Sequence, residues 1–433
     1  MKKNAYRAKN INLISQEQLK EKLPRGRAIV AVDVAKHLFV AGISGADGKV
    51  VQYLRFTHPV QTRQFLDLLE AINGWTSLDV VMEPTGTYGD ALRGQLLSRG
   101  IPCFAVSPKR CHDAAEIFDG VPSLHDAKAT SILARLHTQG LSKPWPEDDQ
   151  VRRELRAAIA RREIYAAPLH SHQGRLEALL SRQWPEFCEY LNPNKRKTPL
   201  ALLAEYPSPA LVAQNPEAAA KLMMSYSRGK LSSETITKVV ASARTSLGVR
   251  MNEQECRLLS ELAQQMLNLW REVNRIDKEI ASLARSNTET MRLAPTLGVV
   301  TAAVLVALLG PVTTYESAGA YVKAIGINLK EHSSGKSKKV GTGLHITKRG
   351  PGLARKYLFL ATLRLIQRDP ICRAWYQSRR SYGHGEKLKA VVALMRKLAR
   401  GLWHVGRGEP FDASKLFDTS RLALLETQQV ANA

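Results

Sequence analysis

The sequence predicts an α/β domain followed by a mainly helical remainder, and three observations lead to this fold class. Short apolar, β-branched runs alternate with amphipathic stretches from residue 27 to about 110, which is typical of a sheet with helices on its faces. Two long stretches, near residues 151–190 and 252–286, carry apolar residues at helical spacing. The length of 433 residues suggests about two to four domains.

The elements of the first domain follow from its turns and periodicity. Residues 27–42 and the stretch "GADGKVVQYLRF" lie on either side of an Asp-Gly turn and predict a β-hairpin. The next segments predict, in order, a helix at 59–74, an apolar strand within 78–86 that ends near Glu83, a helix at 89–100, a strand-like run at 102–108 and a closing helix at 124–140. The Pro- and acid-rich "SKPWPEDD" after them predicts a linker.

The remainder is predicted to be helical. Residues 151–187 and a second long helix are expected to pair as a helical hairpin or coiled coil, and the second helix presents an apolar face formed by Leu258, Leu262, Met266, Leu269 and Val273. The segment "MRLAPTLGVVTAAVLVALLG" has two interpretations. It is either a helix-hairpin-helix element whose turn amides contact phosphates or a buried core helix with a loop before it.

The charge of the chain favours a nucleic-acid partner. Its 63 Lys and Arg residues exceed its 39 Asp and Glu residues, for a net charge of +24, and such a surplus releases counterions from a polyanion. No apolar run approaches the ~20 residues of a membrane span, and the first residues lack the apolar core of a secretory signal. The five cysteines are scattered, as in a protein with reduced thiols. We therefore expect a cytoplasmic protein without a membrane partner.

Three acids stand where carboxylates are unusual. Asp33 lies within an apolar strand, Glu83 ends another, and Asp126 opens the helix "HDAKATSILARL". Any one of them alone is equally well explained as a structural cap or ion pair, because a buried carboxylate requires a partner. Together they are typical of a ribonuclease-H-like sheet edge, where carboxylates hold Mg²⁺ or Mn²⁺ for phosphodiester chemistry.

A second candidate site is the lysine-rich stretch "GINLKEHSSGKSKKVGTGLHITKRG", residues 326–350. Basic residues in and just after it outnumber its one acid, Glu331, and predict contacts to nucleic-acid phosphates; they are Lys330, Lys336, Lys338, Lys339, Lys348, Arg349, Arg355 and Lys356. Ser333 and Ser334 in this field are either phosphate ligands or nucleophiles, and a serine nucleophile needs activation by a base, a metal or positive charge. His332 is a candidate base by adjacency alone.

The order of motifs identifies a family resemblance. "VAVDVAK", "VVMEPTG", "FAVSPKR", "HDAKATSILARL", "LAPTLGVVTA", "GINLKEHSSG", "KRGPGLARKYL" and "VVALMRKLARGLW" together resemble transposases of insertion-sequence family 110/1111, which includes the Piv-type DNA invertases. The resemblance implies a RuvC-like domain with four carboxylates, a helical connection, a C-terminal domain with a catalytic Ser-Gly serine, and guidance by a structured RNA. The boundaries it implies are a basic arm at 1–26, the RuvC-like domain at 27–148, the helical connection at 149–288, the transposase domain at 289–405 and a tail at 406–433.

Carried over by motif, the first two acids of the family are Asp33 and Glu83, and its serine is Ser334, with Ser333 as the alternative. The third and fourth acids depart from the family pattern. Aligned on "ILAR", Asp126 is the third acid and Ala129 takes the place of the fourth. Aligned on "DA", Asp126 is the fourth and Ser123 replaces the third. One carboxylate is missing in both registers, and Asp113 or Asp119 is a candidate substitute.

The sequence thus predicts a DNA recombinase. Asp33, Glu83 and Asp126 with Mg²⁺ or Mn²⁺, together with Ser334, would cut and rejoin donor and target DNA under the direction of a guide RNA, in a homodimer or homotetramer. Two alternatives stay open. One is a RuvC-like nuclease that hydrolyses branched DNA without a serine step, and the other is a nucleic-acid-binding protein whose active site has decayed.

Overall fold

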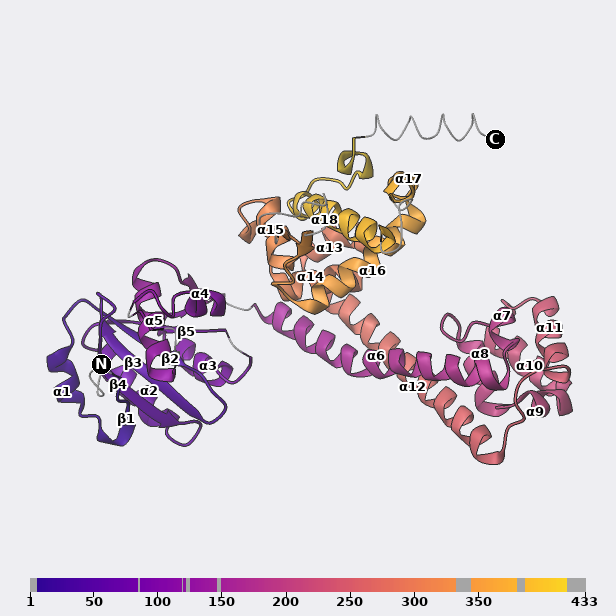
Figure 1. Cartoon of the computed structure of the whole chain (residues 1–433), viewed down its shortest axis with the longest axis horizontal. Coiled ribbons are helices and arrows are strands. Elements are labelled where there is room, and N and C mark those ends of the chain that lie inside the picture. Colours follow the sequence, from indigo (N-terminus) through magenta and orange to yellow (C-terminus); the bar gives the residue numbers. More distant parts are fainter. Residues whose placement is uncertain are drawn as a thin grey trace. The chain divides into compact units, whose positions relative to one another are not determined.

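The computed structural model of the chain describes residues 6–84, 86–118, 120–121, 125–145, 149–331, 344–379 and 386–418 (Figure 1). It divides into two compact units, Met1–Glu147 and Asp148–Ala433. The first unit is α/β and the second is almost entirely helical, which confirms the predicted fold class at this level. No helix in these ranges is both long enough and apolar enough to cross a membrane.

A seven-stranded mixed sheet forms the centre of the first unit, in the order β1-β4-β3-β2-β5-β6-β7. β2 pairs antiparallel with β3 and parallel with β5, and β5 pairs parallel with β6. The strands are β1 (Lys9–Asn10), β2 (Arg27–Asp33), β3 (Leu38–Gly45), β4 (Val50–Thr57), β5 (Ser77–Met82), β6 (Cys103–Ala105) and β7 (Lys143–Pro144).

Three details of this sheet differ from the sequence prediction. Residues 27–42 hold two strands rather than one, because the chain turns back after Asp33, so the predicted hairpin is a three-stranded meander. The Asp-Gly turn itself is confirmed and joins β3 to β4, with Gly48 at φ +72°. Lys9–Asn10 of the basic arm pairs with β4, and Lys143–Pro144 of the expected linker pairs with β6, so both segments extend the sheet edges.

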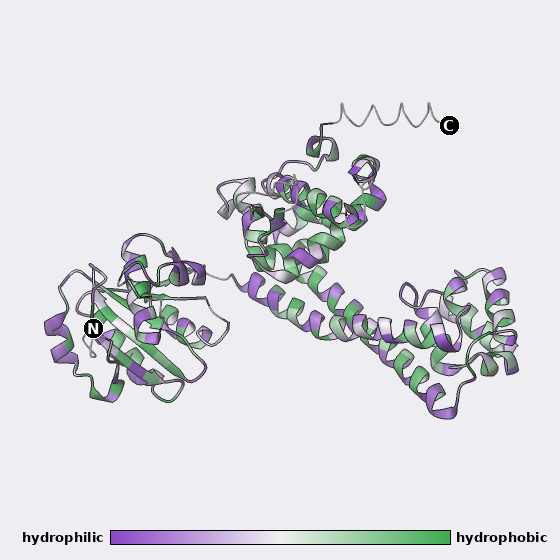
Figure 2. Ribbon diagram, in the orientation of Figure 1, coloured by the Kyte–Doolittle hydropathy of each residue, from purple (hydrophilic) through white to green (hydrophobic). Residues whose placement is uncertain are grey.

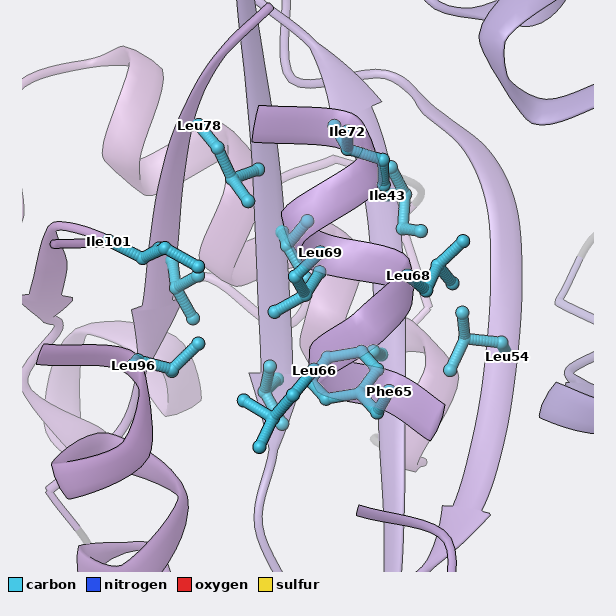
Figure 3. Packing of buried hydrophobic residues seen from close by; sticks show 14 of the residues in the cluster. Ile43, Leu54, Phe65, Leu66, Leu68, Leu69, Ile72, Leu78, Leu96 and Ile101 are labelled. Atoms are coloured by element: carbon cyan, nitrogen blue, oxygen red, sulfur yellow. The ribbon is translucent and has the colours of Figure 1, made fainter. Parts of the chain in front are cut away.

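Helices cover both faces of the sheet, and strand alternation decides which side chains face which layer. On β2, Ala28, Val30 and Val32 belong to the core beneath α2 and α3, whereas Ile29 and Ala31 belong to the core beneath α4 and α5. Figure 3 shows how Phe65, Leu69 and Ile72 of α2 pack in the first of these cores. The helices of this unit are α1 (Gln16–Lys22), α2 (Thr62–Asn73), α3 (Asp90–Ser98), α4 (Pro108–Asp113) and α5 (Asp126–Thr138), with the short η1 (Ile11–Leu13).

Two long helices that pack along each other form the first part of the second unit. α12 begins with a reciprocal capping box between Asn252 and Glu255. Its buried face includes Leu259 rather than the predicted Leu258, whose side chain is 52% exposed. The helices are α6 (Gln150–Gln183), α7 (Phe187–Tyr190), α8 (Lys197–Glu205), α9 (Pro209–Gln214), α10 (Pro216–Ser227), α11 (Ser233–Arg244) and α12 (Glu253–Ala284).

The C-terminal part of this unit is built around α14, which is apolar on all sides. Most other helices carry both hydrophilic and hydrophobic residues, as the purple and green segments in Figure 2 show. Residues Thr301–Ala307 of α14 are buried between α13, α16 and α6. The elements here are α13 (Thr288–Leu297), α14 (Val299–Leu309), η2 (Val312–Thr314), α15 (Ala318–Ile325), β8 (Leu329–Glu331), β9 (Leu344–Ile346), α16 (Gly352–Arg368), α17 (Pro370–Arg379), α18 (Glu386–Gly406) and η3 (Ala413–Leu416).

The β8–β9 hairpin carries the lysine-rich loop, and two glycines hold its base against the helical core. The backbone N–H of Lys348 donates to the Gly326 carbonyl at 2.8 Å, and the N–H of Thr347 donates to the Asn328 carbonyl at 2.9 Å. Gly350 lies so close to the end of α15 that an added Cβ would be 2.2 Å from the Ala324 carbonyl oxygen. The close approach of the two backbones therefore requires glycine at position 350.

Gly350→Ala is expected to destabilise the second unit, because the methyl group has only backbone atoms to displace. A loss of ~1–3 kcal/mol would lower Tm by about 2–4 °C per kcal/mol in a unit of this size. Gly352→Ala is the matched control, since its Cβ would meet nothing closer than 3.7 Å. Equal Tm values for the two variants in thermal unfolding would contradict this account of the hairpin base.

Candidate active site

Asp33 and Glu83 lie at the same edge of the sheet because β2 and β5 are parallel neighbours. Val32 is paired with Met82, so the last residue of β2, Asp33, is level with the residue that follows β5, Glu83. Side chains alternate along a strand. Asp33 therefore lies on the same face of the sheet as Ile29 and Ala31, four and two residues before it. Glu83 lies on that face as well, because it follows Val81 by two residues. Both carboxylates thus belong to the side covered by α4 and α5.

Asp126 reaches this region from α5, which packs across β2 and β3. It is the first residue of the helix, after the N-cap His125, whose Nδ1 accepts the backbone N–H of Lys128 at 3.3 Å. The first turn of a helix favours a negative charge. Asp126 is exposed, whereas Asp33 and Glu83 are half-buried.

The pKa of Asp33 shows that the three acids interact. Burial, the charge of Asp126 and the charge of Glu83 raise the pKa of Asp33 to about 6, against a hydrogen bond from the Val34 backbone N–H that lowers it. A buried carboxylate beside two others is the arrangement in which like charges oppose ionisation. The structure therefore brings together the three acids that the sequence singled out from separate segments.

Their chemistry fits a hard divalent cation. Carboxylate oxygens are the ligands that Mg²⁺ and Mn²⁺ prefer, and a cation between the acids would replace their repulsion by attraction. In the described parts of the chain, no three His, Cys, Asp or Glu side chains converge tightly enough to form a metal site as they stand. The carboxylates are thus close enough to repel one another, and coordination would require their side chains to draw together.

Cys111 belongs to the same site and was missed by the sequence analysis. This buried thiol on α4 hydrogen-bonds to Glu83, and burial, Glu83 and Asp33 all raise its pKa. A thiol held neutral in this way keeps its proton and donates a hydrogen bond to the Glu83 carboxylate, which restrains the orientation of that carboxylate. The only signal in the sequence is the position of Cys111 on the inner face of a short helix, which is equally typical of ordinary core packing.

Of the four positions considered for the missing acid, the structure describes Ala129 and Asp113. Ala129 lies one turn beyond Asp126 and is 6% exposed, within the core beneath α5. Asp113 is exposed at the end of α4 and pairs with Lys109, which lowers its pKa. Ser123 and Asp119 lie outside the described residues. Asp113 is therefore held by a local lysine in this structure.

The second unit carries the predicted basic cluster. Ser333, Ser334, His332, Lys336, Lys338 and Lys339 lie outside the described residues. The remaining cations surround the base of the β8–β9 hairpin, where Lys330 is paired with His345 across the strands and Lys348 and Arg349 are exposed.

Two members of this cluster already have partners within the chain. Arg355 donates to the backbone carbonyls of Ile325 and Gly350, at 3.1 and 2.7 Å. Lys356 forms an ion pair of 2.8 Å with Glu163 of α6. Lys330, Lys348 and Arg349 are therefore the described members best placed to meet a phosphate.

Comparison with known proteins places this geometry in a family. Residues 30–185 match a family model of DEDD transposases of the IS110 type, and residues 289–377 match the model described as "Transposase IS116/IS110/IS902 family". The two matches together cover more than half of the chain. The chain belongs to the IS110 family of transposases. The transposase is also 22% identical, over 87% of its length and 94% of the relative's, to the "Insertion element IS116 uncharacterized 44.8 kDa protein" of Streptomyces clavuligerus.

The two matches coincide with the two candidate sites. The first contains Asp33, Glu83 and Asp126, and its DEDD designation indicates a carboxylate site that depends on a divalent metal. The second contains the β8–β9 hairpin and the basic cluster around it. The transposase therefore acts on DNA, and both sequence-predicted sites fall in segments that define its family.

Asp33→Asn is expected to stabilise the metal-free transposase at neutral pH. The folded-state pKa of Asp33, about 6, exceeds its ordinary 3.8, so ionisation destabilises the fold above pH 6 and no longer does so below about pH 4. In EDTA at pH 7.5 the variant should unfold roughly 2–6 °C above the parent, and this difference should vanish near pH 4.

The exposed Asp67→Asn on α2 is the control for this measurement, and its Tm should match that of the parent at both pH values. A lower Tm for Asp33→Asn at pH 7.5 would show that the carboxylate makes a stabilising contact instead of suffering repulsion.

Proposed function

We propose that this transposase cuts and rejoins DNA at a composite site, with metal-binding carboxylates from a RuvC-like first unit and Ser334 from the second. The observation that carries the proposal is the mutual repulsion of Asp33, Glu83 and Asp126 at one sheet edge. Carboxylates that repel one another and so destabilise the folded protein are typical of functional sites, because carboxylates with a structural role usually form ion pairs or hydrogen bonds with nearby donors. The parallel β2–β5 register and the position of α5 supply the geometry.

Each group has a distinct role in the proposed reaction. Asp33, Glu83 and Asp126 would hold Mg²⁺ or Mn²⁺, which when bound supplies Lewis-acid stabilisation of a phosphoryl oxygen. Cys111 would keep the Glu83 carboxylate in position. The Ser334 hydroxyl would attack phosphorus, losing its proton, and a DNA oxygen would leave and take up a proton. The phosphoserine ester conserves the bond energy, so a second strand can reverse the step.

The cations at the hairpin base would hold the DNA. Lys330, Lys348 and Arg349 are exposed there, and Lys336, Lys338 and Lys339 follow in the loop next to Ser334. Positive groups fixed before the reaction stabilise charge that develops on the phosphate. Arg355 and Lys356 are the last two members of the cluster. They also have structural contacts, since Arg355 binds the backbone at the hairpin base and Lys356 of α16 binds Glu163 of α6.

The expected partners follow from the proposed strand exchange and from the net positive charge of the chain. Exchange of two strands requires at least two active sites, so the acting species would be a homodimer or homotetramer in the bacterial cytoplasm. The surplus of +24 suits a guide RNA as well as DNA, with sequence read by base pairing and the protein contacting backbone and shape. A second candidate, a decayed enzyme that only binds nucleic acid, is favoured by one observation: a carboxylate of the family pattern is missing, at Ala129 in one register or at Ser123 in the other.

Ser334→Ala is expected to abolish a covalent protein–DNA product. Protein, guide RNA, Mg²⁺ and a nicked substrate should give a species that survives denaturant and disappears on protease treatment. Ser333→Ala is the matched control and should retain that species, since it changes the neighbouring hydroxyl only. Full recombination by Ser334→Ala would contradict the serine mechanism and favour hydrolysis or direct transfer at the carboxylates.

Ala129→Asp tests the alignment of the acids on "ILAR". The position is 6% exposed, and an uncompensated carboxylate there should lower the Tm in EDTA by several degrees. If position 129 faces the metal, millimolar Mg²⁺ should restore the Tm and activity should be retained or raised. Ala129→Asn has the same size without the charge and should show no rescue. A Tm that Mg²⁺ leaves unchanged in both variants would exclude this register.

A further inference from the structure

A second basic feature of the C-terminal helices lies apart from the β8–β9 hairpin in sequence. A groove of about 880 Å³ is formed by the end of α13, the start of α14, the C-terminal part of α16 and residues 405–411. Three arginines from two different elements line it: Arg292 on α13, and Arg364 and Arg368 on α16. All three are exposed.

The three arginines outnumber the two acids of the groove wall, Asp369 and Glu409, so the groove keeps a positive excess. None of the three arginines forms an ion pair with an acid in the described part of the chain. The pKa of Arg364 is lowered, first by the partial burial of its guanidinium and second by the nearby positive charge of Arg368. The two acids in the groove wall are engaged elsewhere, since Asp369 accepts the Cys372 N–H at 2.8 Å and Glu409 pairs with His404 at 2.9 Å.

Two of the three arginines, Arg292 and Arg364, are held in place by hydrogen bonds to oxygens at the border of the groove. The Arg364 guanidinium donates to the Leu297 carbonyl at 3.0 Å and to the Thr301 hydroxyl at 2.9 Å, so it bridges the end of α13 and the first turn of α14. Arg292 donates to the Gly406 carbonyl at 3.1 Å. Arginines fixed in this way lose little conformational entropy when an anion binds.

The floor of the groove adds backbone donors to these cations. Gly298 joins α13 to α14 at φ +81°, and no side chain caps α14. Gly298 is exposed, Val299 and Val300 are half-buried, and all three residues line the groove at the first turn of α14. An open helix N-terminus complements negative charge, and here three arginines surround it. The structure confirms that α14 is a buried core helix, whereas the phosphate contact of the helix-hairpin-helix interpretation stays a prediction.

We propose that this groove binds the phosphate backbone of the transposase's DNA, through residues other than the three acids and the lysine-rich stretch. Charge complementarity and an open groove fit a polyanion, and DNA is the polyanion on which the family acts. Arginines and backbone amides contact phosphates without reading sequence, so the groove sets the position of the duplex. The inference rests on the transposase function alone and not on the proposed serine chemistry.

The test is the salt dependence of binding to a 30-bp duplex by the full-length protein. Arg368 makes no hydrogen bond to a described residue, so Arg368→Gln should fold normally. The double variant Arg292→Gln/Arg368→Gln should bind more weakly, and the slope of log K against log salt should fall by about 0.9 for each phosphate that the protein no longer neutralises. Lys221→Gln/Lys230→Gln makes the same charge change with two exposed lysines of the segment α10 to α11 and should leave the slope unchanged.

Three results would overturn the proposal: an unchanged slope in the groove variant, an equal change in the lysine control, or weaker binding to a structured RNA of similar length without weaker binding to duplex DNA. Asp33→Asn, measured in parallel, should keep duplex affinity while losing strand cleavage. Failure of the groove proposal is thereby distinguished from failure of the proposed chemistry, since each concerns a different variant and a different readout.

Discussion

The parallel pairing of β2 with β5 is the constraint on which the active site depends. This register sets Asp33 level with Glu83, and the two-residue period of each strand turns both carboxylates towards α4 and α5. A shift of one residue would move a carboxylate into the opposite core beneath α2 and α3. The apolar residues that alternate along both strands therefore fix the positions of the acids as well as the stability of the sheet.

The transposase keeps like charges together in both units. Asp33 is opposed by two carboxylates in the first unit, and Arg364 is opposed by Arg368 in the second. Neither arrangement stabilises the free protein, and each becomes favourable when a partner of opposite charge binds. A divalent cation would stabilise the acids, and the phosphates of DNA would stabilise the arginines. The strand-exchange reaction that we propose requires both the cation and the DNA.

Much of this architecture could be predicted from the sequence, because it depends on local pattern. The order of strands and helices, Glu83 at the end of a strand and Asp126 at a helix start follow from periodicity and turns, whereas the end of β2 at Asp33 does not, since residues 27–42 form one uninterrupted apolar pattern. What could not be predicted depends on tertiary packing. The pairing of Lys9–Asn10 and Lys143–Pro144 at the sheet edges has no pattern of its own. Leu258 and Leu259 differ only in helix phase, and the contact of Cys111 with Glu83 depends on how α4 crosses the sheet.

The central claim is that three acids from distant segments bind one metal site, and iron-directed cleavage of the backbone tests it most directly. Fe²⁺ bound in place of Mg²⁺, with ascorbate and peroxide, produces hydroxyl radicals that cut the chain near the ion. The account predicts cuts close to residues 33, 83 and 126 that excess Mg²⁺ suppresses and that Asp33→Asn abolishes together. Cuts elsewhere only, or cuts at one of these segments without the other two, would contradict it.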